Sequence, residues 1–167
     1  MLHPAALPTE TLMADCDLRR TRRSGPGGQH RNKVETAVVI THRPTGITAE
    51  GSERRSLEQN RLRALFRLRV NLALGVRSPI QPDHEPGPLW QSRCRGGKVV
   101  VNLEHEDFPA LLAEALDVVT ALQMDIPAAA ARLGSTSSQL VKFLQQEPRA
   151  IGLVNAVRER QRKHKLK

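Results

Sequence analysis

The chain has 167 residues, of which 26 are Lys or Arg and 17 are Asp or Glu, so its formal net charge is +9. A hydrophobic share of 39% is enough for a buried core and excludes wholesale disorder. The absence of any apolar run of about 18 residues argues against a membrane span, and residues 1–10 lack the pattern of a secretory signal. Two distant Cys residues indicate a reduced, cytoplasmic protein, and only 3 Phe and 1 Trp exclude a base-stacking platform.

The positive charge is concentrated in two segments. Residues 17–77 hold 14 Lys or Arg and 5 acidic residues, and residues 155–167 hold 6 Lys or Arg and Glu159 as the one acid. Residues 78–154, between them, carry a net charge of −3. Cations clustered in this way are typical of contact with a nucleic-acid backbone. A solvated surface explains the helix arginines alone equally well.

The first part of the chain predicts a small sheet. Residues 17–22 fit an edge strand, and residues 34–41 alternate and are rich in β-branched side chains, as in a half-buried strand. Residues 43–46 have Pro and Gly where a type I turn prefers them, so residues 47–50 should pair back as a hairpin.

A long helix should follow this sheet. Ser56 and Gln59 match a capping box, which predicts the helix start, and Gly75 suits its end. We expect its Leu-rich side to pack on the sheet. The outward side should then carry Asn60, Arg63, Arg67 and Asn71.

The second part of the chain predicts helices after a proline-rich stretch. We expect a strand over residues 98–103 and helices over 109–123, 125–134 (ended by Gly134), 135–146 (capped by Ser135) and from Pro148 onward. The predicted fold class is therefore α+β. Its predicted parts are a catalytic-type domain (1–77), a linker (78–97), a helix-turn-helix-like module (98–154) and a basic tail (155–167).

A Gly-rich run is the part of the sequence that indicates chemistry: residues 22–33 read RRSGPGGQHRNK. Gln29 cannot serve as a general base, and no nucleophile–base pair lies near it in the sequence. Gly27 and Gly28 permit a backbone that only glycine adopts, and such a turn can offer N–H groups and an amide to an oxyanion or a water. The pattern favours an ester hydrolysis completed by a partner. A surface turn or phosphate loop is the alternative, although the Gly-Lys-Ser/Thr ending of nucleotide loops is missing.

This run, with THRPTG at 41–46, RS at 55–56 and NR at 60–61, closely resembles the catalytic domain of class I peptide chain release factors and related ribosome-rescue hydrolases. The resemblance covers residues 17–74. It implies that a loop containing Gly27, Gly28 and Gln29 promotes hydrolysis of the peptidyl-tRNA ester in the ribosome, without a cofactor or metal. It also implies N5-methylation of Gln29 by a glutamine methyltransferase. The residues expected to contact ribosomal RNA or tRNA are Arg22, Arg23, His30, Arg31, Asn32, Lys33, Arg63 and Arg67.

The surroundings of this domain favour codon-independent release. Residues 1–16 precede it, and no segment resembles the domain that reads stop codons in release factors. We therefore expect a cytoplasmic monomer that rescues stalled ribosomes, with the ribosome and peptidyl-tRNA as partners and no membrane. The alternative is a non-catalytic ribosome- or nucleic-acid-binding protein that uses the loop as a contact, although such a protein has no need of the glutamine.

Residues 125–144 resemble a helix-turn-helix, with small residues at Ala130 and Gly134. In a DNA-binding version Thr136, Ser137, Gln139 and Lys142 would reach base edges, but the negative charge of the module favours a structural or ribosome-docking role. Rescue hydrolases of this type carry a basic tail that enters the mRNA channel. By resemblance the tail residues are Arg158, Arg160, Arg162, Lys163, Lys165 and Lys167. A solubilising end is the alternative.

Overall fold

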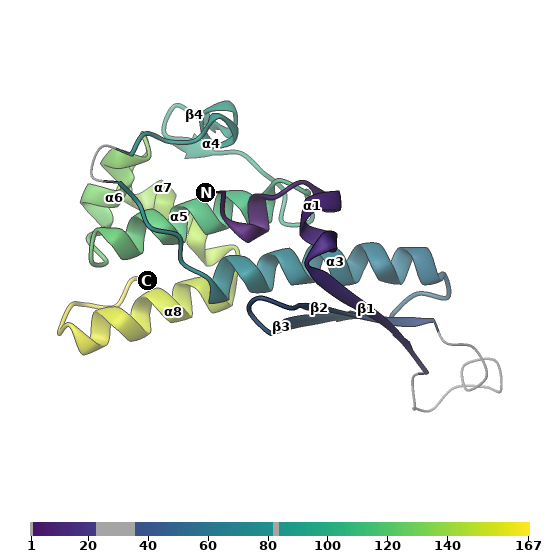
Figure 1. Ribbon diagram of the computed structural model, residues 1–167. Coiled ribbons are helices and arrows are strands. Elements are labelled where there is room, and N and C mark those ends of the chain that lie inside the picture. Colours follow the sequence, from purple (N-terminus) through teal and green to yellow (C-terminus); the bar gives the residue numbers. More distant parts are fainter. Residues whose placement is uncertain (1, 23–35, 82–83) are drawn as a thin grey trace.

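The computed structural model describes residues 2–22, 36–81 and 84–167, and it combines a three-stranded sheet, one long helix and a helical half formed by residues 84–167 (Figure 1). The elements in chain order are η1 (Pro4–Ala6), α1 (Thr9–Ala14), β1 (Cys16–Thr21), β2 (Ala37–His42), β3 (Ile47–Gly51), α3 (Leu57–Gly75), α4 (Pro88–Arg93), β4 (Cys94–Arg95), β5 (Lys98–Val99), α5 (Phe108–Ala121), α6 (Ile126–Arg132), α7 (Ser137–Gln145) and α8 (Pro148–Arg160). The predicted α+β architecture is confirmed.

The sheet is antiparallel with strand order β1-β2-β3, so β1 is an edge strand as predicted. The turn over residues 43–46 joins β2 to β3. Thr21 pairs with Ala37 at the other end of the β1–β2 ladder. The two ends of the connection between β1 and β2 therefore leave the sheet side by side.

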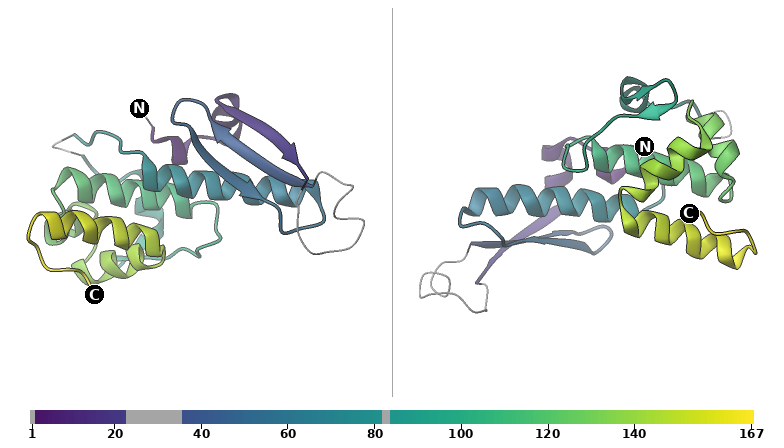
Figure 2. Two further views of the ribbon diagram at one scale, coloured as in Figure 1. Left: turned by 90° about the horizontal axis from the view of Figure 1, so that it is seen from below. Right: turned by 180° about the vertical axis from the view of Figure 1, so that it is seen from behind.

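Helix α3 begins and ends where the sequence predicts. The Ser56 hydroxyl accepts a hydrogen bond from the Gln59 N–H at 3.3 Å, and Gly75 is the last helical residue. The helix lies between the sheet and α5 (Figure 2), so it is covered on two sides.

The prediction of which side of α3 meets the sheet was wrong. Asn60 is fully buried, whereas Leu62 is 57% exposed. Arg67 donates to the Glu50 carbonyl at 2.8 Å and Asn71 to the Thr48 carbonyl at 2.9 Å. Because β3 is an edge strand, its outward carbonyls need donors, and these polar side chains of the helix supply them.

Gly51 permits the close approach of β3 to α3. A Cβ atom at this position would lie 2.0 Å from the Asn60 carbonyl oxygen and 2.9 Å from the Ala64 nitrogen, both backbone atoms. Only glycine can occupy the position without moving the helix away from the strand. This contact fixes the start of α3 against the end of the sheet.

The residues predicted as a linker include regular structure. Residues 84–87 are irregular, but residues 88–95, which the sequence analysis placed in the linker, form α4 and β4. Trp90 of α4 is fully buried, donates from its indole to the Leu133 carbonyl at 2.7 Å and meets Phe143 edge-on. The Gly87 N–H also donates to the Glu114 carboxylate at 2.6 Å. The strand predicted over residues 98–103 is shorter, since β5 covers only Lys98–Val99.

Helices α6 and α7 have the predicted helix-turn-helix arrangement, with Gly134 at φ +63° in the turn. The Asp125 side chain caps α6, as expected. The cap of α7 differs from the prediction, because Thr136 rather than Ser135 accepts from the Gln139 N–H. The Ser135 hydroxyl instead donates to the Gly97 carbonyl, a contact that joins the turn to β5 and that no local pattern encodes.

One continuous apolar core runs from the sheet through α3 to the helical half. The N-terminal segment forms part of it, because η1 packs against both α3 and α5, and Ala5 and Leu12 are buried. Arg69 of α3 donates to the Ala5 carbonyl at 2.9 Å, and the His3 imidazole contacts the Val76 carbonyl at 3.2 Å. Burial lowers the pKa of His3. None of the helices in the described ranges has both the length and the apolar character needed to cross a bilayer.

Candidate functional site

The residues expected to carry the chemistry belong to the connection between β1 and β2. The predicted residues Arg23, Gly27, Gly28, Gln29, His30, Arg31, Asn32 and Lys33 lie outside the described residues. Gln29 is equally far along the chain from Arg22 and Thr36, the described residues on either side. Because Thr21 and Ala37 are paired, the sheet fixes both ends from which this connection starts.

Asn60 holds one of these two ends. Its amide donates to the Thr36 carbonyl at 2.7 Å and to the Arg54 carbonyl at 2.9 Å, and its side-chain oxygen accepts from the Arg54 N–H at 2.9 Å. The residue is fully buried. A single side chain of α3 therefore ties together the end of the β1–β2 connection and the turn before α3. The sequence analysis placed Asn60 on the outer face and missed this role, although the NR pair at 60–61 was part of the family resemblance.

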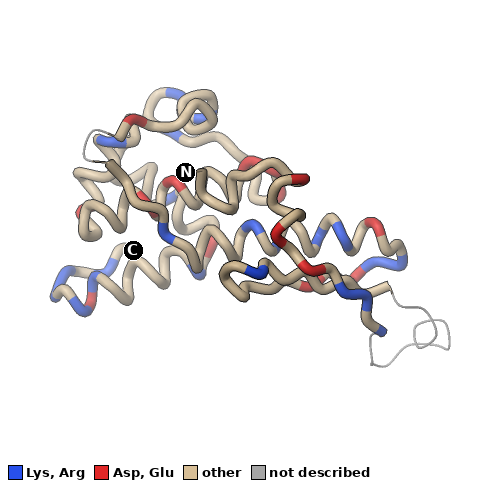
Figure 3. Tube along the Cα trace, in the orientation of Figure 1, with Lys and Arg blue, Asp and Glu red and all other residues tan. Residues whose placement is uncertain are grey.

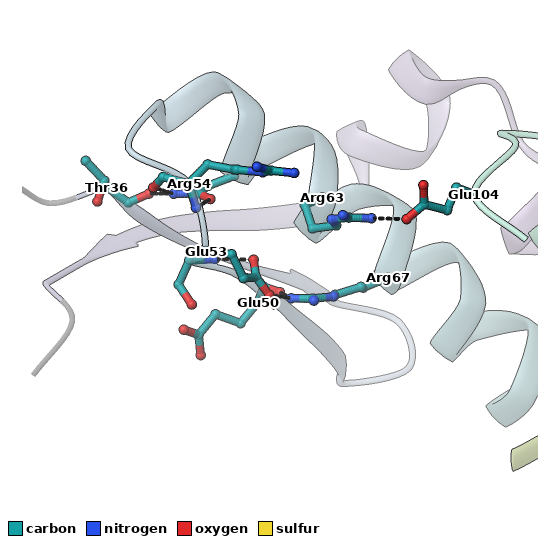
Figure 4. Close-up of polar contacts among 9 residues, drawn as sticks. Thr36, Glu50, Glu53, Arg54, Arg63, Arg67 and Glu104 are labelled. Atoms are coloured by element: carbon teal, nitrogen blue, oxygen red, sulfur yellow. Dashed lines mark hydrogen bonds and ion pairs between the residues drawn. The ribbon is translucent and has the colours of Figure 1, made fainter. Parts of the chain in front are cut away.

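Two arginines predicted to contact RNA are engaged within the chain. Figure 4 shows Arg67 beside Glu50 and Glu53, and Arg63 beside Glu104. Arg67 forms an ion pair with Glu53 at 2.5 Å, and Arg63 forms one with Glu104 at 3.2 Å. All four side chains of these pairs are at least 36% exposed, so the pairs are surface interactions of small energy.

The Glu53 carboxyl has a strongly lowered pKa of about 2. Partial desolvation raises this pKa, but hydrogen bonds from the Ser52 and Glu53 N–H groups and the Arg67 guanidinium outweigh that effect. Replacing Arg67 with Ala should raise the Glu53 pKa toward its ordinary value of 4.5. The stabilisation from this carboxylate is complete above pH 4.5 and is lost as pH falls toward 2, because the folded-state pKa is the lower one.

The measurement is an NMR titration of the glutamate carboxyl carbons. Arg61→Ala is the matched control, since Arg61 faces Glu58 and leaves the Glu53 pair intact. A Glu53 pKa near 4.5 in the unmodified protein would contradict the pairing.

Further cations lie close to the ends of the β1–β2 connection. Arg19 and Arg20 are exposed on β1, and Arg54 and Arg55 are exposed between β3 and α3. Figure 3 shows Lys and Arg along α3 and toward the outer end of β1. The sequence analysis did not single out these four residues, although their position beside the Gly-rich run was a usable signal.

A groove of about 840 Å³ lies between α1, α3 and the residues before α5. Leu62 and Phe66 contribute apolar surface, Arg54 and Arg69 line one part, and three acids line another, namely Glu104, Glu106 and Asp107. Both charge signs are present, so the groove is not a simple anion site. Within the described ranges, no group of three His, Cys, Asp or Glu side chains is placed to hold a metal.

The predicted tail is partly helical. Arg158 and Arg160 belong to α8, and residues 161–167 follow it without regular secondary structure. Arg158 and Lys163 make hydrogen bonds within the chain. The other predicted tail residues, Arg160, Arg162, Lys165 and Lys167, are exposed.

Comparison with known proteins agrees with the motif and with the fold around it. Residues 8–85 match the RF-1 domain family. Peptide chain release factor PrfB1, chloroplastic, of Arabidopsis thaliana is 47% identical over 72 residues, covering 43% of this chain and 16% of the relative. Peptide chain release factor 1 of Xylella fastidiosa is 46% identical over 65 residues, covering 39% and 18%.

Peptide chain release factor 1 of Caulobacter vibrioides is 46% identical over 71 residues, covering 41% of this chain and 20% of the relative. The chain thus spans between 16% and 20% of the length of these relatives. The similarity is confined to the part that contains the sheet, α3 and the Gly-Gly-Gln sequence. Over residues 8–85 the chain is therefore a class I release factor-like protein with an RF-1 domain.

Proposed function

We propose that this protein promotes hydrolysis of the peptidyl-tRNA ester on the ribosome and thereby releases the nascent peptide. The observation that carries the proposal is an intact Gly27-Gly28-Gln29 sequence within a matched RF-1 domain. This sequence lies on a connection whose ends are fixed by the β1–β2 ladder and by Asn60. A reactive turn held on a rigid scaffold is positioned more precisely than one on a free chain.

The proposed chemistry uses few groups of the protein. As water attacks the ester carbonyl, the Gln29 backbone N–H stabilises the oxyanion that forms, and the Gln29 side chain positions the water. Gly27 and Gly28 allow the turn that presents these donors. The ribosome supplies the remaining groups. Gln29 would also be the residue modified by a glutamine methyltransferase.

The finer proposal is that release does not depend on a codon, as in the rescue hydrolases that the motif also resembles. The helical half and its basic end would then dock the protein on ribosomal RNA. The partners would be the ribosome and peptidyl-tRNA, bound by a monomer in the cytoplasm.

The test measures peptide release from ribosomes stalled on truncated mRNA. Wild type should release the peptide, and Gln29→Ala and Gly28→Ala should each slow release by about 10²-fold, the usual effect of disturbing an oxyanion-stabilising donor. Gln81→Ala is the matched control, because Gln81 is exposed in the connection after α3.

Equal rates for wild type, Gln29→Ala and Gly28→Ala would refute the hydrolase and favour a binding protein. Parallel reactions with a stop codon or a sense codon in the ribosomal A site test codon independence. Release that requires a stop codon would overturn the finer proposal only.

A further inference from the structure

The basic C-terminal segment is folded back on the helical half. Asn155 of α8 donates to the Leu166 carbonyl at 3.1 Å and accepts from the Leu166 N–H at 2.8 Å. The Leu166 side chain packs against the apolar core. This reciprocal pair and the apolar contact hold residues 161–167 in a defined turn.

Two cations add to this attachment. Arg158 donates to the Met124 carbonyl at 2.7 Å and to the His164 carbonyl at 2.9 Å, and Lys163 donates to the Gln123 carbonyl at 2.6 Å. Gln123 and Met124 follow the C-terminal end of α5, where a cation is favourably placed. Arg158 and Lys163 therefore have a structural use for their charge.

The remaining cations of this segment are presented to solvent. Arg160, Arg162, Lys165 and Lys167 are exposed, as is Lys142 on the neighbouring α7. Lys167 and Lys142 also line a pocket of about 470 Å³ beside Leu166, and among its described lining residues there is no Asp or Glu. Figure 3 shows this gathering of Lys and Arg at the end of α8.

The charge around this surface indicates its partner. Residues 155–167 carry 6 Lys or Arg against one acid, whereas residues 78–154 have an excess of acids. A polyanion would therefore meet attraction at the docked segment and repulsion over most of the helical half. The segment has no aromatic residue for base stacking, so phosphates are the groups that it can bind.

We propose that residues 155–167 bind the phosphates of RNA as a fixed basic platform, in their docked conformation, and not as an extended tail. The inference rests on the proposed function, which supplies ribosomal RNA as the partner. Cations that are already held in place lose less conformational entropy on binding than cations of a free chain. Undocking the segment should therefore weaken binding even though every charge is retained.

The experiment separates docking from charge. Asn155→Ala and Leu166→Ala undock the segment without changing its charge, and faster trypsin cleavage after Lys163 identifies the variant that is undocked. Arg160→Gln with Lys165→Gln removes two charges and leaves the docking contacts in place. Leu153→Ala is the matched control for Leu166→Ala, because Leu153 is an exposed Leu on α8. The affinity of each variant for isolated ribosomal RNA is measured at several salt concentrations.

The platform predicts that the undocked variant binds RNA several-fold more weakly than wild type, while Leu153→Ala binds normally. The charge variant should bind more weakly and lose about 0.7 to 0.9 of log–log salt slope per lost phosphate contact. RNA binding by the undocked variant that equals or exceeds wild type would overturn the platform. Gln29→Ala should bind RNA like wild type, so a failure of peptide release and a failure of the platform are distinguishable.

Discussion

Replacing Asn60 with Ala is expected to slow peptide release at least tenfold and to lower the free energy of unfolding by about 3 kcal/mol. The substitution removes three hydrogen bonds at a fully buried site and leaves the Thr36 and Arg54 carbonyls without their donor. Each buried polar group left unsatisfied costs about 1–3 kcal/mol. The effect on release follows because Thr36 ends the connection that carries Gln29, and a freed carbonyl no longer fixes that end.

Two variants make this prediction specific. Asn60→Asp has nearly the same shape but places a carboxylate against two carbonyls, so it should be at least as harmful as Asn60→Ala. Asn71→Ala is the control on the same helix, because Asn71 donates only to the Thr48 carbonyl. It should cost about 1 kcal/mol and leave release unchanged.

Urea denaturation gives the stability of each variant, and single-turnover release on saturating stalled ribosomes gives the rate. Saturation separates a misplaced loop from weaker binding. An Asn60→Ala protein that is destabilised but releases peptide at the wild-type rate would show that Asn60 acts on folding alone.

Replacing Trp90 with Ala should lower the free energy of unfolding by about 3–5 kcal/mol, as for other large aromatic residues truncated in a core. Trp90 is fully buried, contacts Phe143 edge-on and donates to the Leu133 carbonyl. Trp90→Phe keeps an aromatic ring but loses the indole donor, so it should cost less than Trp90→Ala.

Because the chain has a single Trp, the unfolding of these variants is followed by circular dichroism and not by fluorescence. Leu62→Ala is the control, since this large apolar side chain is mostly exposed and should cost less than about 1 kcal/mol. A Trp90→Ala protein as stable as Leu62→Ala would mean that α4 is not part of the core.

The features that the sequence predicted well are those set by neighbouring residues. The hairpin turn at 43–46, the Ser56 cap and the helix-turn-helix of α6 and α7 each depend on a few adjacent side chains. The family resemblance was likewise visible in short motifs, and residues 8–85 match the RF-1 domain.

The features that the sequence did not predict depend on distant parts of the chain. Asn60 looked like a surface residue of a helix until β2 and the turn before α3 supplied partners for all its polar atoms. Trp90 lies among prolines, and its burial depends on Leu133 and Phe143, which are far along the chain. The docking of Leu166 on Asn155 similarly follows no local pattern. The predicted roles of residues 23–33 stay predictions.

The N-terminal segment limits how this domain can be transplanted. Since η1 fills the space between α3 and α5, a chimera built from residues 8–85 alone would bare apolar surface on α3 to water. A workable graft must bring α5 and residues 2–7 along, and any reporter fused at the front must leave the His3 imidazole in its buried place. The portable piece is therefore larger than the stretch of similarity suggests.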